Sequence, residues 1–191
     1  MSVKGGKAVK TAFLTDIQIE KKMDLALLAK NGDKDAFSSL IQENKRNLYR
    51  VAKGILHHEA DVEDAIQMTI LKAYENIGKL RVAEYFKTWL IRILINECKS
   101  MLRKRNRTVY LDSTNQEIAS FEDTYENLEL QEALYSLKEK LRIVTVLFYY
   151  EDLSTKEIAK LLAIPEGTVR SRLSKARTLL QQKLNEYRKE Q

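Results

Sequence analysis

The segment from Leu153 to Leu184 constrains the fold more than any other part of the chain, because it has the pattern of two helices joined by a tight turn. Ser154 followed three residues later by Glu157 forms a capping box, which begins a helix. Pro165 suits the first position of a second helix, where no backbone N–H is needed. The segment therefore predicts a helix-turn-helix with its turn at residues 164–166.

The second helix of this pair separates into an apolar stripe and a polar face. Four apolar residues recur at helical spacing and are expected to be buried: Val169, Leu173, Ala176 and Leu180. The remaining face is rich in cations and hydroxyls, which suits contacts with phosphates and with base edges in a major groove. The predicted DNA-reading residues are Thr168, Arg170, Ser171, Arg172, Ser174, Lys175 and Arg177. A solvated face on an ordinary helical hairpin is the alternative.

The composition predicts helices almost throughout. One proline and six glycines interrupt 191 residues, and good helix formers fill the rest. The net charge of +6 favours polyanionic partners without identifying one. We predict an all-α protein made of two small helical domains joined by a flexible linker.

The hydrophobic pattern divides the chain into four parts. Residues 1–22 are basic without an apolar core, so we interpret them as a flexible tail rather than a secretory signal. Residues 23–107 form one predicted helical domain and residues 128–191 form another, which contains the helix-turn-helix. Residues 108–127 are acidic, lack Lys and Arg, and are interpreted as the linker. This linker could lie against the basic ends it joins and hinder DNA binding, although a solvated spacer is the more common case.

Four helices are expected in the first domain. Leu25, Leu28 and Ala29 share one face of the first helix, and residues 31–33 supply a stop and a new N-cap. Gly78 is expected to end the third helix. The inward positions of the second to fourth helices are predicted to be Phe37, Leu40, Ile41, Leu48, Val51, Ala52, Ile55, Val62, Ala65, Ile66, Thr69, Ala73, Ile77, Phe86, Leu90, Ile93 and Leu94.

The run at residues 143–150 in the second domain has strand-like composition. We still predict a helix there, because a stripe of three- and four-residue spacing passes through it. The stripe consists of Leu130, Leu134, Leu137, Leu141, Val144 and Phe148.

The cysteine and the two histidines indicate neither a metal site nor a cofactor. Cys98 lies in an apolar-periodic segment, which favours a core role, and a single cysteine fits a reducing cytosol. His57 and His58 are adjacent and point in different directions on a helix, so we interpret them as a helix-end pair. The longest apolar run, residues 143–150, is too short to span a bilayer. We expect a cytoplasmic protein that is not inserted in a membrane.

Two segments of the first domain have the residue types of binding surfaces. Tyr85, Phe86 and Trp89 are interleaved with basic groups, a combination that can stack unpaired bases and hold their phosphates. A role in the core is the alternative for these aromatics, Trp89 included. Upstream, acidic, amide and apolar residues at helical spacing suit a protein partner better than DNA: Asp61, Asp64, Gln67 and Met68.

These motifs, in this order, resemble RNA polymerase sigma factors of the extracytoplasmic-function type, which is group 4 of the sigma-70 family. Residues 61–77 are similar to the region 2 helix that grips the clamp coiled coil of the polymerase's largest subunit. Residues 86–105 resemble the minus-10 recognition helix, and GTVRSRLSKAR resembles the minus-35 reading helix of region 4. The minus-10 pattern is matched by Phe86, Thr88, Trp89, Leu90, Arg92, Ile93 and Asn96.

The resemblance implies a non-enzymatic protein that binds core RNA polymerase and directs promoter-specific initiation, and it implies an anti-sigma factor as a further partner. Residues 23–107 would be the region 2 domain and residues 128–191 the region 4 domain. The four residues from Asp61 to Met68 named above would contact the polymerase. The minus-10 DNA would be bound by Lys79, Arg81, Tyr85, Trp89, Asn96, Lys99 and Arg103. The polar face of the second helix-turn-helix segment would read minus-35 DNA.

The chain departs from the family pattern at three places. Met68 stands where an acidic residue is usual, and Ile70 stands where phenylalanine is usual. Leu137 is followed by Lys138 rather than by proline. The loop after Gly78 is the most variable part of the family, so its base preference does not transfer.

Two other classes of protein are alternatives to a sigma factor. A conventional dimeric helix-turn-helix regulator would bind duplex DNA by itself. A helical enzyme acting on nucleic acid would need a carboxylate pair, a metal cluster, a phosphate loop or a nucleophile–base set, and the sequence shows none of these motifs.

Overall fold

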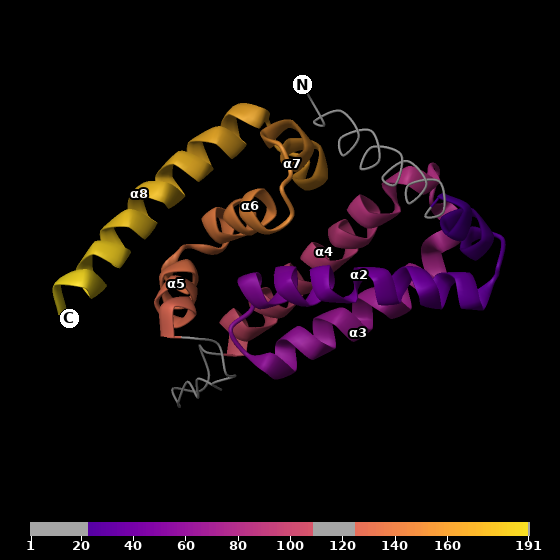
Figure 1. Ribbon diagram of the computed structural model, residues 1–191, viewed down its shortest axis with the longest axis horizontal. Helices are drawn as coiled ribbons and strands as arrows, with labels where there is room; N and C mark the ends of the chain where they lie inside the picture. The colour runs from indigo at the N-terminus through magenta and orange to yellow at the C-terminus, as the bar shows by residue number, and fades with distance from the viewer. Residues whose placement is uncertain (1–22, 109–124, 191) are drawn as a thin grey trace, which may run out of the picture.

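The computed structural model describes residues 23–108 and 125–190, and the regular structure in these ranges is helical (Figure 1). This confirms the predicted all-α class. Residues 23–30 form a helix that is followed by α2 (Lys34–Ile55), α3 (Glu59–Asn76), single 3-10 turns at Ile77–Lys79 and Ala83–Tyr85, α4 (Phe86–Thr108), α5 (Tyr125–Ser136), α6 (Glu139–Tyr150), α7 (Thr155–Leu162) and α8 (Glu166–Glu190). The predicted tail, and residues 109–124 of the predicted linker, lie outside the described residues. Helix α5 begins at Tyr125, three residues before the expected start at residue 128.

Residues close in sequence determine where α2 begins. Gly32 has a φ of +98°, which ends the preceding helix in a conformation that suits glycine. The side chain of Asp33 accepts hydrogen bonds at 2.9 Å from the backbone N–H groups of Asp35 and Ala36. The predicted stop and N-cap are therefore confirmed.

Helices α2, α3 and α4 enclose the core of the first unit. All of the predicted inward residues of these helices are buried, except Ile66 and Ile93, which are partly buried against the same cluster. Leu28, which shares a helix face with Leu25 and Ala29 by spacing, is 49% exposed, so only part of that face is covered. The inward face of helix 23–30 runs through Ala26 and Ala29, three residues apart, and this spacing turns Leu28 outward.

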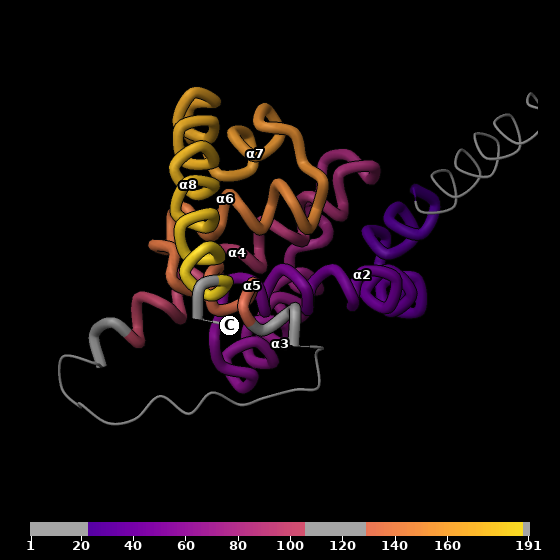
Figure 2. Tube along the Cα trace, turned by 60° about the vertical axis from the view of Figure 1, so that its left-hand side comes forward, coloured from indigo at the N-terminus to yellow at the C-terminus, as the bar shows by residue number. Residues whose placement is uncertain are grey.

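Helix α6 confirms that the strand-like run is helical and shows why its composition is unusual. Every residue from Leu141 to Leu147 is buried, Arg142 and Thr145 included. The helix packs against α2 on one side and α8 on another, and α7 also contacts it (Figures 1 and 2). A helix that is covered all round needs apolar residues at consecutive positions, so its amphipathic period is lost.

The predicted N-cap of the first helix of the helix-turn-helix is confirmed. Ser154 and Glu157 make the complete capping box of α7. Helix α7 ends at Ala163, which has the left-handed φ of 53°. The carbonyl of Pro165 accepts hydrogen bonds from the N–H groups of Thr168 and Val169, so Pro165 lies just before the first helical residue rather than at it.

The two helical units pack directly against each other. Helix α2 of the first unit contacts α5 and α6 of the second, and α4 contacts α7. A single apolar cluster runs from Ala26 in the first unit to Ala176 in the second. Among the described residues, no helix combines the length and the apolar character needed to cross a membrane.

Candidate nucleic-acid interface

The polar face of α8 is present, but its members have different surroundings. Ser171, Ser174 and Lys175 are exposed, whereas Thr168 and Arg172 are partly buried. Exposed Arg170 donates a hydrogen bond from Nη2 to Glu166 Oε1 at 2.7 Å. The same carboxylate oxygen accepts a hydrogen bond from Thr155 Oγ1, also at 2.7 Å. The start of α8 is thereby tied to the start of α7, which fixes where Arg170 projects.

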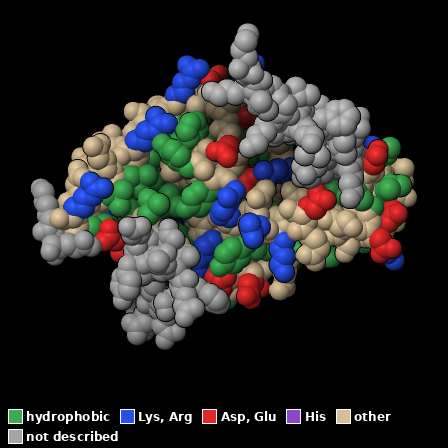
Figure 3. Space-filling view, in the orientation of Figure 1, with side chains coloured by type: hydrophobic (Ala, Val, Ile, Leu, Met, Phe, Trp, Pro, Cys, Tyr) green, Lys and Arg blue, Asp and Glu red, His purple; other side chains and the backbone are tan. Residues whose placement is uncertain are grey.

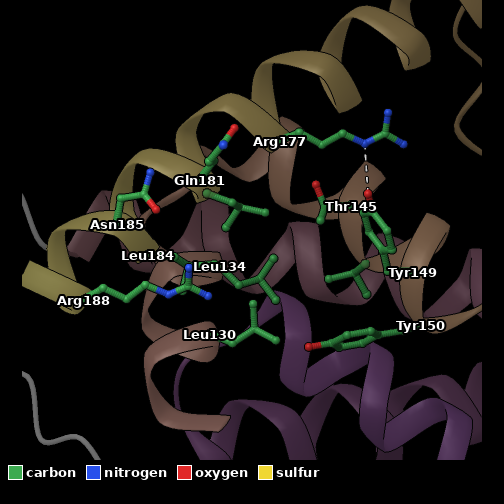
Figure 4. A pocket seen from close by; sticks show the side chains of 12 residues that line it. Leu130, Leu134, Thr145, Tyr149, Tyr150, Arg177, Gln181, Leu184, Asn185 and Arg188 are labelled. Carbon is green, nitrogen blue, oxygen red and sulfur yellow. Dashed lines mark hydrogen bonds between the residues drawn. The ribbon is translucent and has the colours of Figure 1, made fainter. Parts of the chain in front are cut away.

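Arg177 differs from the rest of this face because α6 holds its side chain. Its Nε donates a hydrogen bond to the hydroxyl of Tyr149 at 2.9 Å (Figure 4). The guanidinium carbon lies 5.5 Å from the ring centroid of Phe148 and 5.9 Å from that of Tyr149. A cation over two aromatic rings is stabilised by their negative faces. Arg177 is therefore directed toward α6.

Arg177 also borders a groove that sequence reasoning missed. The groove has a volume of about 490 Å³ and lies between α5, α6 and α8 (Figure 4). Apolar side chains line most of it, and Figure 3 shows them gathered on this face with Lys and Arg side chains around them. Leu130 is one of the lining residues and is 42% exposed, although the stripe had placed it inward. Leu184, which continues the apolar stripe of α8, was the available sequence signal.

Helix α4 carries a polar stripe made of Arg92, Asn96, Lys99 and Arg103, spaced by three or four residues. Arg92, Asn96 and Arg103 are exposed, and Lys99 is partly buried. Burial lowers the pKa of Lys99, while Glu139 raises it and Arg103 and Arg172 lower it further by smaller amounts. The stripe is a row of hydrogen-bond donors that suits a nucleic-acid backbone.

The aromatic residues near the start of α4 divide between the core and the surface. Phe86 is buried, and its ring centroid lies 5.9 Å from that of partly buried Trp89. Tyr85 is 61% exposed. Trp89 therefore packs on the core and still offers an accessible edge, so the two sequence interpretations are compatible. Nearby, Lys79 and Arg81 are both exposed.

Helix α3 presents the face predicted for a protein partner. Asp64 and Gln67 are exposed, and Met68 is 39% exposed. Asp61 is partly buried and pairs with Arg105 Nη1 at 3.3 Å. Sequence reasoning missed two apolar members of this face, Leu71 (51% exposed) and Tyr74 (46% exposed), which follow Gln67 at steps of four and three. Exposed apolar residues bordered by carboxylates are typical of a protein-binding surface.

The described part of the chain holds no cluster of three metal-ligating His, Cys, Asp or Glu side chains. Cys98 is fully buried, and burial raises the pKa of its thiol to about 12. This is the core position expected from the sequence. His58 is the N-cap of α3, as expected for a helix-end histidine.

Comparison with known proteins decides the family. Sigma-70 region 2 matches residues 40–108, and Sigma-70 region 4 matches residues 127–180. The ECF RNA polymerase sigma factor SigW of Bacillus subtilis is 33% identical over 174 residues, which cover 82% of this chain and 93% of SigW. The chain belongs to the ECF sigma factors. Its function is therefore to direct RNA polymerase to promoters, without catalysis of its own, and the conventional regulator is not favoured.

Two solved structures share the fold of this sigma factor. One is the sigma factor RpoE of Bartonella quintana in complex with the anti-sigma factor NepR, with a TM-score of 0.72 and 27% identity over 80% of this chain and 98% of RpoE. The other is CnrH in complex with the cytosolic domain of CnrY, with a TM-score of 0.68 and 26% identity over 86% of this chain and 97% of CnrH. The exposed faces of α3, α4 and α8 in this sigma factor thus lie on a fold known from sigma factors.

Proposed function

We propose that the two units of this sigma factor divide promoter recognition, with residues 23–107 capturing the minus-10 element and residues 128–191 holding the minus-35 duplex. One observation carries the proposal. Helix α4 combines an accessible edge of Trp89 with a stripe of polar donors, which together suit an unpaired strand rather than a duplex. The minus-10 residues are the seven predicted from Lys79 to Arg103, and the minus-35 residues are those of the α8 face, which begins at Thr168. Arg177 of that face takes part only if it leaves its contacts with Tyr149 and Phe148.

The protein then promotes strand separation through its binding free energy for DNA. Unpairing a base costs a few kcal/mol, and stacking a base on an aromatic side chain returns about 1–3 kcal/mol. Trp89 and Tyr85 provide aromatic surface for stacking, and Lys99 and Arg103 lie further along α4 to hold phosphates. Contacts of α8 with the minus-35 duplex supply the remaining free energy.

Core polymerase is the proposed partner of the exposed face of α3. Asp64 and Gln67 provide polar contacts, and Met68 and Leu71 provide apolar area beside them. Asp61 is partly engaged by Arg105, so its contribution depends on release of that ion pair. The solved structure of RpoE from Bartonella quintana contains the anti-sigma factor NepR, and we extend that class of partner to this chain. A cytoplasmic location follows, because core polymerase is found there.

Transcription from two templates tests the division of labour. One template is a duplex promoter and the other carries a pre-melted minus-10 region, each tested with core polymerase in the presence and absence of this protein. We expect Trp89→Ala to reduce transcription from the duplex template by about fivefold or more, because the loss of stacking weakens strand capture. Transcription from the pre-melted template should fall less. We expect Arg172→Ala to reduce transcription from both templates by the same factor.

Trp89→Phe is the matched control, since it keeps an aromatic face and is expected to retain most of the opening activity. Circular dichroism establishes that each variant is folded. Equal defects of Trp89→Ala and Arg172→Ala on both templates would contradict the division. Absence of binding to core polymerase would contradict the proposed function as a whole.

A further inference from the structure

A carboxylate in the first turn of α8 joins the two helices of the helix-turn-helix. Glu166, the first residue of α8, accepts a hydrogen bond on Oε1 from Thr155 Oγ1 at 2.7 Å, and Thr155 is the first residue of α7. The same oxygen accepts a second hydrogen bond from Arg170 Nη2, also at 2.7 Å. Arg170 is therefore connected through one carboxylate to a helix other than its own.

Both ends of this connection are anchored. Ser154, which precedes Thr155, caps α7 through the complete capping box that it forms with Glu157. Helices α7 and α8 pack against each other, and Val169, next to Arg170 in the chain, is fully buried (Figure 1). The backbone that carries Arg170 and the hydroxyl that holds the carboxylate are thus fixed relative to each other.

The Glu166 carboxylate carries its charge at neutral pH. The hydrogen bond from Thr155 and, after it, the one from Arg170 lower the pKa of Glu166 below its usual value. An ionised carboxylate repels DNA phosphates, whereas a guanidinium attracts them. Because the two charges of the pair oppose each other, the pair contributes less to phosphate binding than a free arginine does.

The pair leaves most of the arginine available to DNA. An exposed ion pair at positions i and i+4 usually stabilises its helix only slightly. This pair differs because α7 holds the carboxylate while 69% of the Arg170 side chain remains exposed. The guanidinium has several N–H donors in a fixed fork, so one hydrogen bond to Glu166 leaves others for a guanine edge. Residues near the N-terminal end of a recognition helix are those that meet base edges.

We propose that Glu166 is a positioning residue for DNA reading, which holds the Arg170 guanidinium at a base edge of the minus-35 duplex and away from the neighbouring phosphates. This inference rests on the proposed function, in which the α8 face holds that duplex. A restrained arginine loses less conformational freedom when it binds guanine, and it is kept from turning to a phosphate when the base is wrong. Glu166 thereby increases discrimination between sequences and decreases affinity for DNA of any sequence.

Selection of DNA by the holoenzyme tests this role. The full chain is assembled with bacterial core RNA polymerase and mixed with duplex DNA whose randomised segment is long enough to hold both promoter elements, and the bound molecules are sequenced. We expect Arg170→Ala to lower the base preference at one minus-35 position by about fivefold or more, as is typical for loss of a bidentate contact. We expect Glu166→Ala to lower the preference at the same position by about threefold or more.

Further variants separate positioning from a general effect on the fold. Glu166→Ala combined with Arg170→Ala should select no worse than Arg170→Ala alone, because Glu166 acts through that arginine. Glu166→Gln keeps an acceptor for both donors and should retain most of the preference, whereas Thr155→Val removes one donor and should lose part of it. Glu186→Ala is the matched control, since it breaks another ion pair of α8, with Lys183, beyond the DNA-reading residues.

Binding to duplex DNA of unrelated sequence gives a readout that a merely structural role would not move in the same direction. We expect the Glu166→Ala holoenzyme to bind such DNA more tightly than the parent, with a logarithmic salt dependence steeper by about 0.9, because the released arginine makes one more phosphate contact. In the Arg170→Ala background, the same change should leave the salt dependence unaltered. A damaged α8 would instead bind all DNA more weakly.

The outcomes distinguish the positioning role from the proposed function. If the parent selects no bases at the minus-35 element, the proposed function of α8 fails and the positioning role fails with it. If the parent selects bases there and Glu166→Ala selects them as strongly, the positioning role is overturned while the proposed function stands. Additive losses in the double variant, or weaker non-specific binding by Glu166→Ala, would also overturn it, because either result would show a contribution independent of Arg170.

Discussion

Acidification is expected to open the interface between the two units through His57. In the closed form, loss of solvent around the imidazole and, after it, the charges of Arg142, His58 and Arg105 lower the pKa of His57 to about 4. Neutral Nε2 can accept a hydrogen bond from Arg142, whereas protonated Nε2 cannot. Separation of the units removes the Arg142 charge and the Tyr135 ring from beside His57, so its pKa should return toward 6.5.

The sign and size of the effect follow from these two pKa values. Because the closed form has the lower pKa, the contribution of neutral His57 to closure is complete above pH 6.5 and is lost as the pH falls toward 4. At pH 5 the difference would be worth about 2 kcal/mol. Water still reaches the residue, and screening reduces this to about 1 kcal/mol, or a fivefold change in the ratio of open to closed molecules.

The assay is the distance between dyes placed on exposed α2 and α8 positions through Gln42→Cys and Gln182→Cys, measured from pH 7.5 to pH 5. The parent protein should open as the pH falls, and His57→Gln should lose most of this dependence while it keeps an acceptor for Arg142. His58→Gln, which changes the neighbouring residue, should behave as the parent. A His57→Gln protein that opens over the same pH range as the parent would refute the reasoning.

Three further predictions concern stability and reactivity. Ser154→Ala removes the cap of α7 and should lower the free energy of unfolding by about 1 kcal/mol in urea titrations, whereas Ser174→Ala on exposed α8 surface should change it little. Leu90→Ala should cost about 2–5 kcal/mol because its side chain is fully buried, and Leu71→Ala, at a half-exposed leucine, should cost much less in the same titration. Cys98, with its pKa raised to about 12, should react with thiol reagents at pH 8 only when urea unfolds the chain; fast labelling of the native protein would show that the site is open to solvent.

Local signals in the sequence predicted local structure well. The capping box at Ser154 and the glycine stop at Gly32 involve residues within a few positions of each other, so tertiary packing was not needed to find them. The apolar stripes of α2 and α4 likewise identified the core, Cys98 included. The exposure of Leu28 could not be predicted, because two alanines define the inward face of this short helix and alanine carries a weak hydrophobic signal.

The contacts between the units could not be predicted, because periodicity shows which face of a helix is buried but not what covers it. Arg177 belongs by spacing to the polar face of α8, yet Tyr149 on another helix determines where its side chain points. The apolar groove beside it needs α5, α6 and α8 together. The need for glycine at residue 54 likewise depends on Val146, 92 positions away, because a Cβ on Gly54 would lie 2.8 Å from Val146 Cγ2.

The packing of α2 on α6 at Gly54, where a Cβ atom would lie 2.8 Å from Val146 Cγ2, also determines how much apolar surface the chain exposes. Opening the units uncovers the α6 surface around Val146 and Tyr150, which is largely apolar. In an open chain this apolar surface is accessible to chaperones, proteases and other open copies. Packing of α2 on α6 covers this apolar surface, so the fit at Gly54 also protects the chain from non-specific association.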